Sequence, residues 1–153
     1  MKSISHRLLL VVLCLLHLFL GINGLIGGTL LMIKTDGSLL GMQVDWLNRS
    51  PFKNYLIPGF LLSLFLGIIP LTTFLGLIKK NNWRITNSFN IYRNRNWAWS
   101  FSLYTRIIAI TWITFQLILT QYFWIQQVII FNGLLIIIIT MLPQIIKQFE
   151  FSE

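Results

Sequence analysis

The sequence predicts an all-α membrane protein, a four-transmembrane-helix bundle with a short external cap segment. Hydrophobic residues make up 56% of the 153 residues and charged residues only 10%, whereas soluble domains carry about 25% charged residues. The mean hydropathy is +0.74. Four apolar segments each reach the roughly 20 residues that a helix needs to cross a bilayer. Residues 1–153 are therefore expected to form a single membrane domain.

The four apolar segments cover residues 8–33, 57–78, 103–123 and 126–146. They are expected to be helices because backbone polar groups in lipid must be satisfied within the segment. The first could instead be a cleaved signal peptide, but its apolar run is longer than the 7–15 residues of a signal core. We therefore expect it to be retained. Pro70 is expected to kink the second helix, because it cannot donate a backbone hydrogen bond.

The basic residues are distributed unevenly over the two sides of the predicted bundle. On the side of the termini and the 79–102 loop lie Lys2, Arg7, Lys79, Lys80, Arg84, Arg93, Arg95, Arg106 and Lys147. On the side of the external segment 34–56 lie Lys34, Arg49 and Lys53. Cytoplasmic loops are enriched in Lys and Arg. We therefore expect both termini and the 79–102 loop to be cytoplasmic in a multi-pass membrane protein.

The 79–102 loop mixes basic residues with Trp83, Tyr92, Trp97 and Trp99. This mixture suits the anionic lipid of an inner leaflet, where each cation contributes about 1 kcal/mol. Aromatic and basic residues together also bind single-stranded nucleic acids, but no RNA-binding fold surrounds the loop, so we expect no nucleic acid partner. Docking to a membrane protein partner, or to a second copy in a homo-oligomer, stays open.

Small residues follow one face of each of the first two predicted helices. They are Gly21, Gly24 and Gly28 in the first helix, and Gly59, Ser63 and Gly67 in the second. Small residues at a spacing of four allow two helix backbones to approach closely in lipid. The pattern predicts that the first two helices pack through these faces.

Four polar residues lie inside the predicted spans: His17, Asn23, Gln116 and Asn132. Polar groups facing lipid are costly, so we expect them to turn inward and form hydrogen bonds across the bundle. An intramembrane ionisable residue is also a functional hypothesis. His17 could carry protons or bind a metal or haem, or it could be a neutral histidine bonded to the backbone or to a neighbouring helix.

Catalytic and metal-binding patterns are absent from the sequence. The four carboxylates, Asp36, Asp45, Glu150 and Glu153, lie outside the apolar spans. No HExxH, GxSxG, P-loop or cysteine cluster occurs. We therefore expect no enzyme activity, no cofactor and no metal site.

The external segment 34–56 has turn and helix signals of its own. Asp36-Gly37 indicates a tight turn, and GMQVDWLN at 41–48 indicates a short interfacial helix. Ser50-Pro51 indicates an N-cap followed by the first residue of a helix. The charged residues Asp36, Asp45, Arg49 and Lys53 could pair with one another or meet a partner in this external cap.

The order TDGSLLGMQVDWL, then SPFKNYLIPG, then an apolar helix resembles a group of small bacterial membrane proteins, described as uncharacterised four-helix integral membrane proteins. WITFQ at 112–116 and the later WIQ are similar too. The resemblance covers about residues 20–140 and rests on the SPFxxYLIPG-type motif. It implies a compact four-helix domain in a bacterial plasma (inner) membrane, and it brings no activity or site residue.

Three classes of function remain open. The absence of a catalytic constellation favours a non-enzymatic accessory, sensing or structural subunit that binds a partner or lipid. A small oligomeric transporter or channel is the first alternative, and it predicts that Asn23, Gln116 and Asn132 line one wet path. A membrane redox protein using His17 is the second, and it predicts a bound haem or metal.

Overall fold

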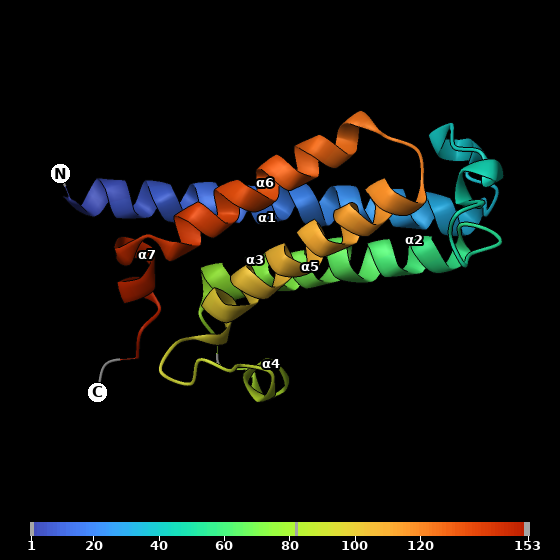
Figure 1. The fold of residues 1–153 in the computed structure, drawn as a ribbon. Coiled ribbons are helices and arrows are strands. Elements are labelled where there is room, and N and C mark those ends of the chain that lie inside the picture. The colour runs from blue at the N-terminus through green and yellow to red at the C-terminus, as the bar shows by residue number, and fades with distance from the viewer. Residues whose placement is uncertain (1, 82, 152–153) are drawn as a thin grey trace.

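The structure, a computed structural model, describes residues 2–81 and 83–151, with side chains from residue 6 onward. Glu153, Asn82 of the 79–102 loop and the side chain of Lys2 lie outside the described residues. Every regular element in the described ranges is helical (Figure 1). Four helices are long and apolar enough to span a membrane. The all-α class and the four-helix bundle are confirmed, and the chain is a multi-pass membrane protein.

Ten helical elements follow one another along the described chain. They are α1 (Lys2–Ile33), η1 (Ser38–Leu40), η2 (Val44–Leu47), α2 (Leu56–Leu62), η3 (Ser63–Ile68), α3 (Ile69–Lys79), α4 (Arg84–Ser88), α5 (Trp97–Leu119), α6 (Trp124–Met141) and α7 (Pro143–Gln148). The elements α2, η3 and α3 form one continuous span, Leu56–Lys79. The other spans are His6–Ile33, Trp97–Leu119 and Trp124–Met141.

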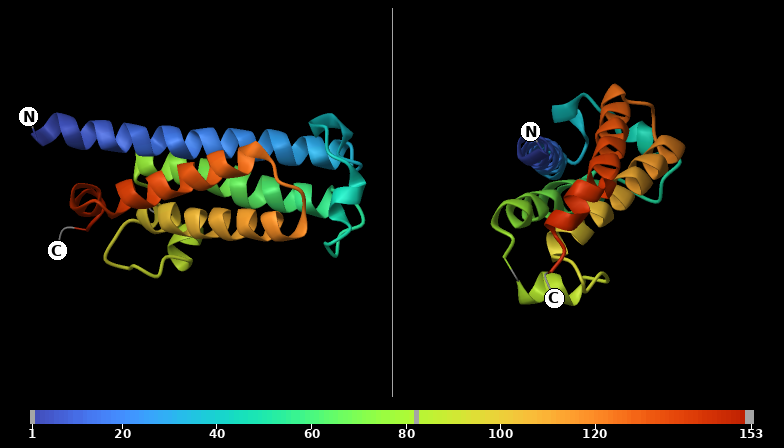
Figure 2. Two further views of the ribbon diagram at one scale, coloured as in Figure 1. Left: turned by 45° about the horizontal axis from the view of Figure 1, so that its top comes forward. Right: turned by 90° about the vertical axis from the view of Figure 1, so that its left-hand side faces the viewer.

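The four spans close into a four-sided bundle. The α1 helix packs against α2, η3 and α3; α3 packs against α5; α5 packs against α6; and α6 packs against α1. Both termini and α4 lie at one end of the bundle, here called the terminal end (Figures 1 and 2). The segment 34–55, with η1 and η2, covers the opposite end, here called the cap end.

The small faces of α1 and of the second span pack against each other, as predicted. A Cβ added to Gly24 would overlap the carbonyl group of Leu66, and one added to Gly28 would lie 2.5 Å from the carbonyl oxygen of Gly59. Gly67 packs against the side chain of Leu25 and lies close to its backbone nitrogen. The two backbones are therefore in direct contact, which any larger residue at these positions would prevent.

Pro70 is absorbed by a change of helix type. The turn before it, η3, is a π-helix, in which the Ile69 N–H donates to the carbonyl of Leu64. Proline has no N–H to donate and crowds the preceding turn, so a regular α-helix cannot continue through it unchanged. A π-turn redistributes the backbone bonds and lets the span continue to Lys79.

The predicted bounds of the third and fourth spans are wrong: the third ends at Leu119 and not at residue 123, because the backbone of Thr120 is extended, and both spans also differ at their terminal ends. The third span begins at Trp97 and not at residue 103, because the Asn96 side chain accepts a hydrogen bond of 3.0 Å from the Ala98 N–H and caps the helix. The fourth ends at Met141, since Leu142 before Pro143 has an extended backbone with ψ of 133°. A separate short helix, α7, then follows.

The cap segment is organised around Tyr55. Its N–H donates to the Thr35 carbonyl and its hydroxyl to the Gln43 carbonyl, both at 2.8 Å. The turn at Gly37 (φ 81°) and the short helix η2 occur where the sequence predicted them. The predicted helix start at Ser50-Pro51 is wrong: Ser50 Oγ donates to Leu47 O and accepts from Phe52 N–H in a local turn, and α2 begins at Leu56.

Replacing Tyr55 by phenylalanine is expected to destabilise the cap by about 1–2 kcal/mol, because the Gln43 carbonyl loses its donor while the ring stays buried. Faster hydrogen exchange of the amides of 37–47, with unchanged exchange in α5, would show this effect. Burial also raises the pKa of the Tyr55 hydroxyl, so the hydroxyl remains a donor throughout the neutral pH range. Uniform exchange changes in both regions would contradict a local role.

Candidate functional site

The early start of α5 carries Arg106 into the bundle. Arg106 lies nine residues after Trp97, which places it about 14 Å along the helix. Its side chain is 0% exposed. The expectation that Arg106 lies with the basic residues of the 79–102 loop and the termini is therefore wrong. Arg106 is an intramembrane arginine.

Arg106 is held by α6. Its Nη1 donates to Asn132 Oδ1 at 3.1 Å, and Asn132 Nδ2 donates to the carbonyl of Leu16 on α1 at 3.4 Å. This chain of bonds links α5, α6 and α1. The other guanidinium nitrogens, Nε and Nη2, are buried without a hydrogen-bond partner. An arginine with unsatisfied donors is unusual in a bundle interior, where lost hydrogen bonds are costly.

His17 lies beside this contact. It is 0% exposed, follows Leu16 on α1, and its Nδ1–H donates to the carbonyl of Leu13 at 2.8 Å. A carbonyl oxygen only accepts, so Nδ1 carries the proton and Nε2 of the neutral ring is an acceptor. Nε2 has no partner. The backbone bond expected for a packing histidine is present, and the free acceptor lies in the same region as the free donors of Arg106. We call His17, Arg106 and Asn132 the polar centre.

The positive charge of Arg106 has no nearby acid among the described residues. Asp36 and Asp45 lie in the cap segment, and Glu150 lies 3.6 Å from Arg95 at the terminal end. A charge within a membrane is costly and marks a functional hypothesis. A fixed positive charge in the bundle interior also raises the barrier to cations, so the polar centre disfavours a cation path along the axis.

A second polar layer lies between the polar centre and the terminal end. Ser102 and Thr140 hydroxyls are 2.9 Å apart, and those of Thr73 and Thr105 are 3.5 Å apart. Trp99 Nε1 donates to the Thr140 carbonyl at 3.0 Å. These bonds satisfy most polar groups of the layer. We therefore interpret the layer as a structural contact between α3, α5 and α6.

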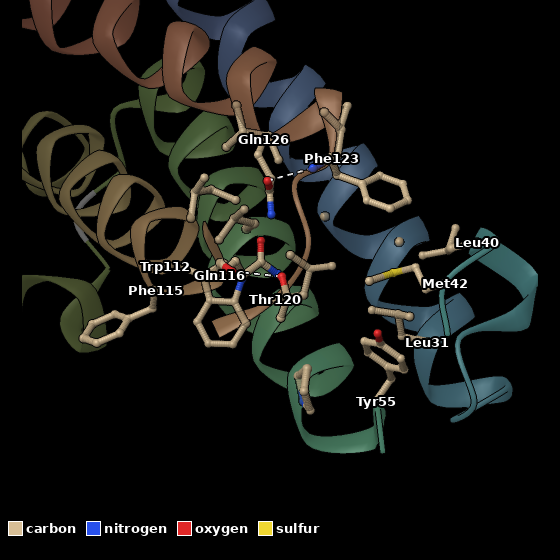
Figure 3. A pocket seen from close by; sticks show the side chains of 18 of the residues that line it. Leu31, Leu40, Met42, Tyr55, Trp112, Phe115, Gln116, Thr120, Phe123 and Gln126 are labelled. Carbon is tan, nitrogen blue, oxygen red and sulfur yellow. Dashed lines mark hydrogen bonds between the residues drawn. The ribbon is translucent and has the colours of Figure 1, made fainter. Parts of the chain in front are cut away.

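A pocket of about 360 Å³ opens in the cap half of the bundle. Its walls come from α1, the cap segment, α2, α5, the 120–123 loop and α6 (Figure 3). The lining is mainly apolar. Polar groups are few, and they include the amide of Gln126 and the indole of Trp112, with Gln116 between them in the view of Figure 3. Among the residues that the structure describes, no Lys, Arg, Asp or Glu lines the pocket.

A hydrophobic cluster forms the floor of the pocket, and an aromatic contact links two of its walls. Leu20, Leu66, Ile113 and Ile129 pack together and separate it from the polar centre. At the cap end, the ring centroids of Trp46 on η2 and Phe123 of the 120–123 loop lie 5.3 Å apart. This contact ties the cap segment to the α5–α6 connection.

The amide of Gln126 is oriented by the backbone. Its Oε1 accepts from the Phe123 N–H at 3.0 Å, so its Nε2 donors point toward the pocket (Figure 3). Trp112 Nε1 is buried without a partner. The pocket therefore combines a large apolar lining with uncharged donors, which is typical of a site for a small apolar or amphipathic molecule.

The four predicted intramembrane polar residues do not form one network. Asn132 and His17 lie in the polar centre, whereas Gln116 lines the pocket. The expectation that Asn23 turns inward is wrong: it is exposed, and its Nδ2 donates to the Phe19 carbonyl of its own helix at 2.7 Å. An amide can satisfy itself against its own helix, and this bond lets Asn23 remain at the pocket rim.

The charged residues of the cap do not pair with one another in the described structure. Asp36, Asp45, Arg49 and Lys53 are exposed, and the ion pair found in the described ranges involves Arg95 and Glu150 instead. The Ser38 N–H donates to Asp36 at 3.0 Å and lowers the pKa of that carboxyl. Asp36 thus supports the turn at Gly37, and the other three charges are free to meet headgroups or a partner.

Comparisons with known proteins find no matching protein-family model, no matching curated protein and no matching solved structure. The resemblance to small bacterial four-helix membrane proteins stays a prediction.

Proposed function

We propose that this protein is a non-enzymatic accessory or sensing protein of a bacterial plasma membrane that binds a lipid-like molecule in the pocket of its cap half. The observation that carries the proposal is a pocket of about 360 Å³ with an apolar, uncharged lining inside a membrane-spanning bundle. Such a site recognises apolar shape and a few hydrogen-bond acceptors. A small transporter would instead need a continuous polar path, and the floor of the pocket separates Gln116 from Asn132.

The charge distribution supports an orientation with the terminal end in the cytoplasm. Without Arg106, eight basic residues lie toward the terminal end and three lie in or beside the cap segment. This excess follows the distribution of Lys and Arg in cytoplasmic loops. The pocket would then be in the outer leaflet, where it could receive a molecule from the lipid or from the outer surface.

The pocket can be filled from α1 without disturbing the helix interface. Gly27 lines the pocket, and a Cβ added there would meet only Leu62 Cδ2 at an ordinary distance of 3.5 Å. A Gly27→Leu side chain would occupy the pocket, whereas Gly27→Ala adds one methyl group and leaves most of its volume. The two variants are a matched pair at one position.

A diacylglycerol analogue with a photoactivatable diazirine in one acyl chain can test occupancy in lipid nanodiscs. We expect saturable labelling of pocket residues such as Trp112 and Tyr55, mapped by mass spectrometry. Gly27→Leu should lower this labelling about tenfold, an effect that corresponds to roughly 1.4 kcal/mol of lost binding. Gly27→Ala should leave it nearly unchanged.

Labelling confined to lipid-facing residues such as Ile118, which is 64% exposed, would overturn the proposal. So would pocket labelling that Gly27→Leu does not reduce. Circular dichroism in the same discs would verify that both variants keep their helices.

A further inference from the structure

The segment 83–93, which contains α4, exposes large apolar side chains. Ile85 and Ile91 are each 78% exposed, and Phe89 is 68% exposed. None of the three contributes to the buried clusters of the bundle. Contiguous exposed apolar residues on a polar segment mark an interaction surface. We call residues 83–93 the α4 segment.

The α4 segment is held by specific bonds. Asn90 Nδ2 donates to the Arg95 carbonyl at 2.8 Å, and the Ile91 N–H donates to Tyr104 Oη at 3.2 Å. The rings of Trp83 and Trp97 stack with centroids 5.4 Å apart. These contacts fix the backbone on α5, so the exposed isoleucines and phenylalanine are presented by an ordered frame.

The position of the α4 segment places it next to lipid. In Figures 1 and 2 it lies beside the flank of the bundle near the terminal ends of α3 and α5, not beyond the end of the helices. The bilayer surrounds the flank of a membrane bundle, so headgroups and upper acyl chains of one leaflet occupy this level. An amphipathic segment lying along such an interface buries its apolar side chains among the acyl chains.

The charge of the α4 segment and its surroundings is positive. Lys79, Arg84 and Arg93 are exposed, and residues 79–102 contain no Asp or Glu. The described acid at this end, Glu150, is paired with Arg95 at 3.6 Å. Basic residues beside inserted apolar residues are complementary to a leaflet that contains anionic lipids.

We propose that the α4 segment is an in-plane docking surface for anionic phospholipid. Ile85, Phe89 and Ile91 insert among acyl chains, while Lys79, Arg84 and Arg93 bind headgroup phosphates. The surface is separate from the pocket, so its function does not depend on occupancy of the pocket. It gives the protein a means of selecting anionic lipid around its terminal end.

The selectivity can be measured by titrating phosphatidylglycerol or phosphatidylcholine into the full-length protein in detergent and counting bound lipids by native mass spectrometry. Two cations at an anionic membrane surface together correspond to a roughly 30-fold change in binding. The double substitution Arg84→Gln/Arg93→Gln should therefore weaken phosphatidylglycerol binding about 30-fold and leave phosphatidylcholine binding unchanged.

Arg49→Gln/Lys53→Gln is the matched control, because it removes two exposed cations at the cap end. It should change phosphatidylglycerol binding by no more than about threefold, since screening limits the reach of exposed charges to roughly 10 Å. Equal losses in the two double variants would overturn the proposal, because they would show a response to net charge alone.

Insertion can be tested with an environment-sensitive fluorophore on Ile85→Cys in a Cys14→Ala background. The emission should shift to the blue in nanodiscs containing phosphatidylglycerol, and Arg84→Gln/Arg93→Gln should reduce the shift. A probe that stays water-exposed in these discs would overturn the proposal. If that probe became shielded only in native membranes, a protein partner would be the occupant instead.

Discussion

Replacing Gly24 by alanine is expected to lower the free energy of unfolding by about 3 kcal/mol, at the upper end of the usual cost of overpacking. The added methyl group would overlap the carbonyl group of Leu66 and lie 2.7 Å from the Gly67 nitrogen. These are backbone atoms, so no side-chain rotation relieves the overlap and the two helices must separate. Unfolding by titration of a denaturing detergent into mild-detergent micelles, followed by circular dichroism, would measure the loss.

Gly27→Ala is the control for this prediction, because it makes the same substitution one turn further along α1. Its Cβ has ordinary space near Leu62, so we expect a change within about 0.5 kcal/mol. Comparable losses at the two positions would contradict direct backbone contact at Gly24 and would indicate a general cost of altering α1. Gly28→Ala should resemble Gly24→Ala, since its Cβ would meet the Gly59 carbonyl.

The contact between α1 and the second span was predictable because its signal is local. Gly24, Gly28, Gly59 and Gly67 repeat at helical spacing within long apolar runs, and in lipid little else than close packing explains such a pattern. The number and order of the spans were predictable for the same reason, since each span is defined by its own run of apolar residues. Neither inference needs knowledge of the partner helix.

Two members of the polar centre, His17 and Asn132, were predicted as inward-facing polar residues, but Arg106 was missed because its placement depends on where a helix begins. The stretch RNRNWAWS reads as a polar loop, and only recognition of Asn96 as an N-cap moves the start of α5 to Trp97 and Arg106 into the interior. The pocket was also outside the reach of sequence reasoning. It depends on how the cap segment, α5 and α6 converge in space, and none of these segments carries a local pattern for a cavity.

The substitution pair Arg106→Met/Asn132→Leu is expected to raise the free energy of unfolding by about 2 kcal/mol. Methionine and leucine keep much of the side-chain volume, while the change removes a buried charge with two unsatisfied nitrogens and no acidic partner in the described structure. Replacement of buried ionic groups by apolar residues is often stabilising by about 1–4 kcal/mol. The same detergent titration would measure the gain.

Single substitutions at Arg106 separate the effect of its charge from that of its hydrogen bond to Asn132. Arg106→Met alone leaves Asn132 Oδ1 without its donor, and an unpaired buried acceptor costs about 1–3 kcal/mol, so the net change should be near zero. Arg106→Lys keeps the positive charge but replaces the planar guanidinium, whose N–H donors have fixed directions, by a flexible ammonium group. We therefore expect it to destabilise the protein. A double variant less stable than the wild type would contradict this reading, because it would mean that the arginine is well compensated where it lies.

A gain in stability from Arg106→Met/Asn132→Leu has a functional implication. Proteins retain destabilising buried groups mainly where activity requires them, so a stabilised double variant would identify the polar centre as a functional element. Lipid labelling of the pocket then separates two roles. The floor formed by Leu20, Ile113 and Ile129 insulates the pocket, so unchanged labelling is expected. Reduced labelling with an intact fold would show that the charge of Arg106 acts on the pocket through that floor.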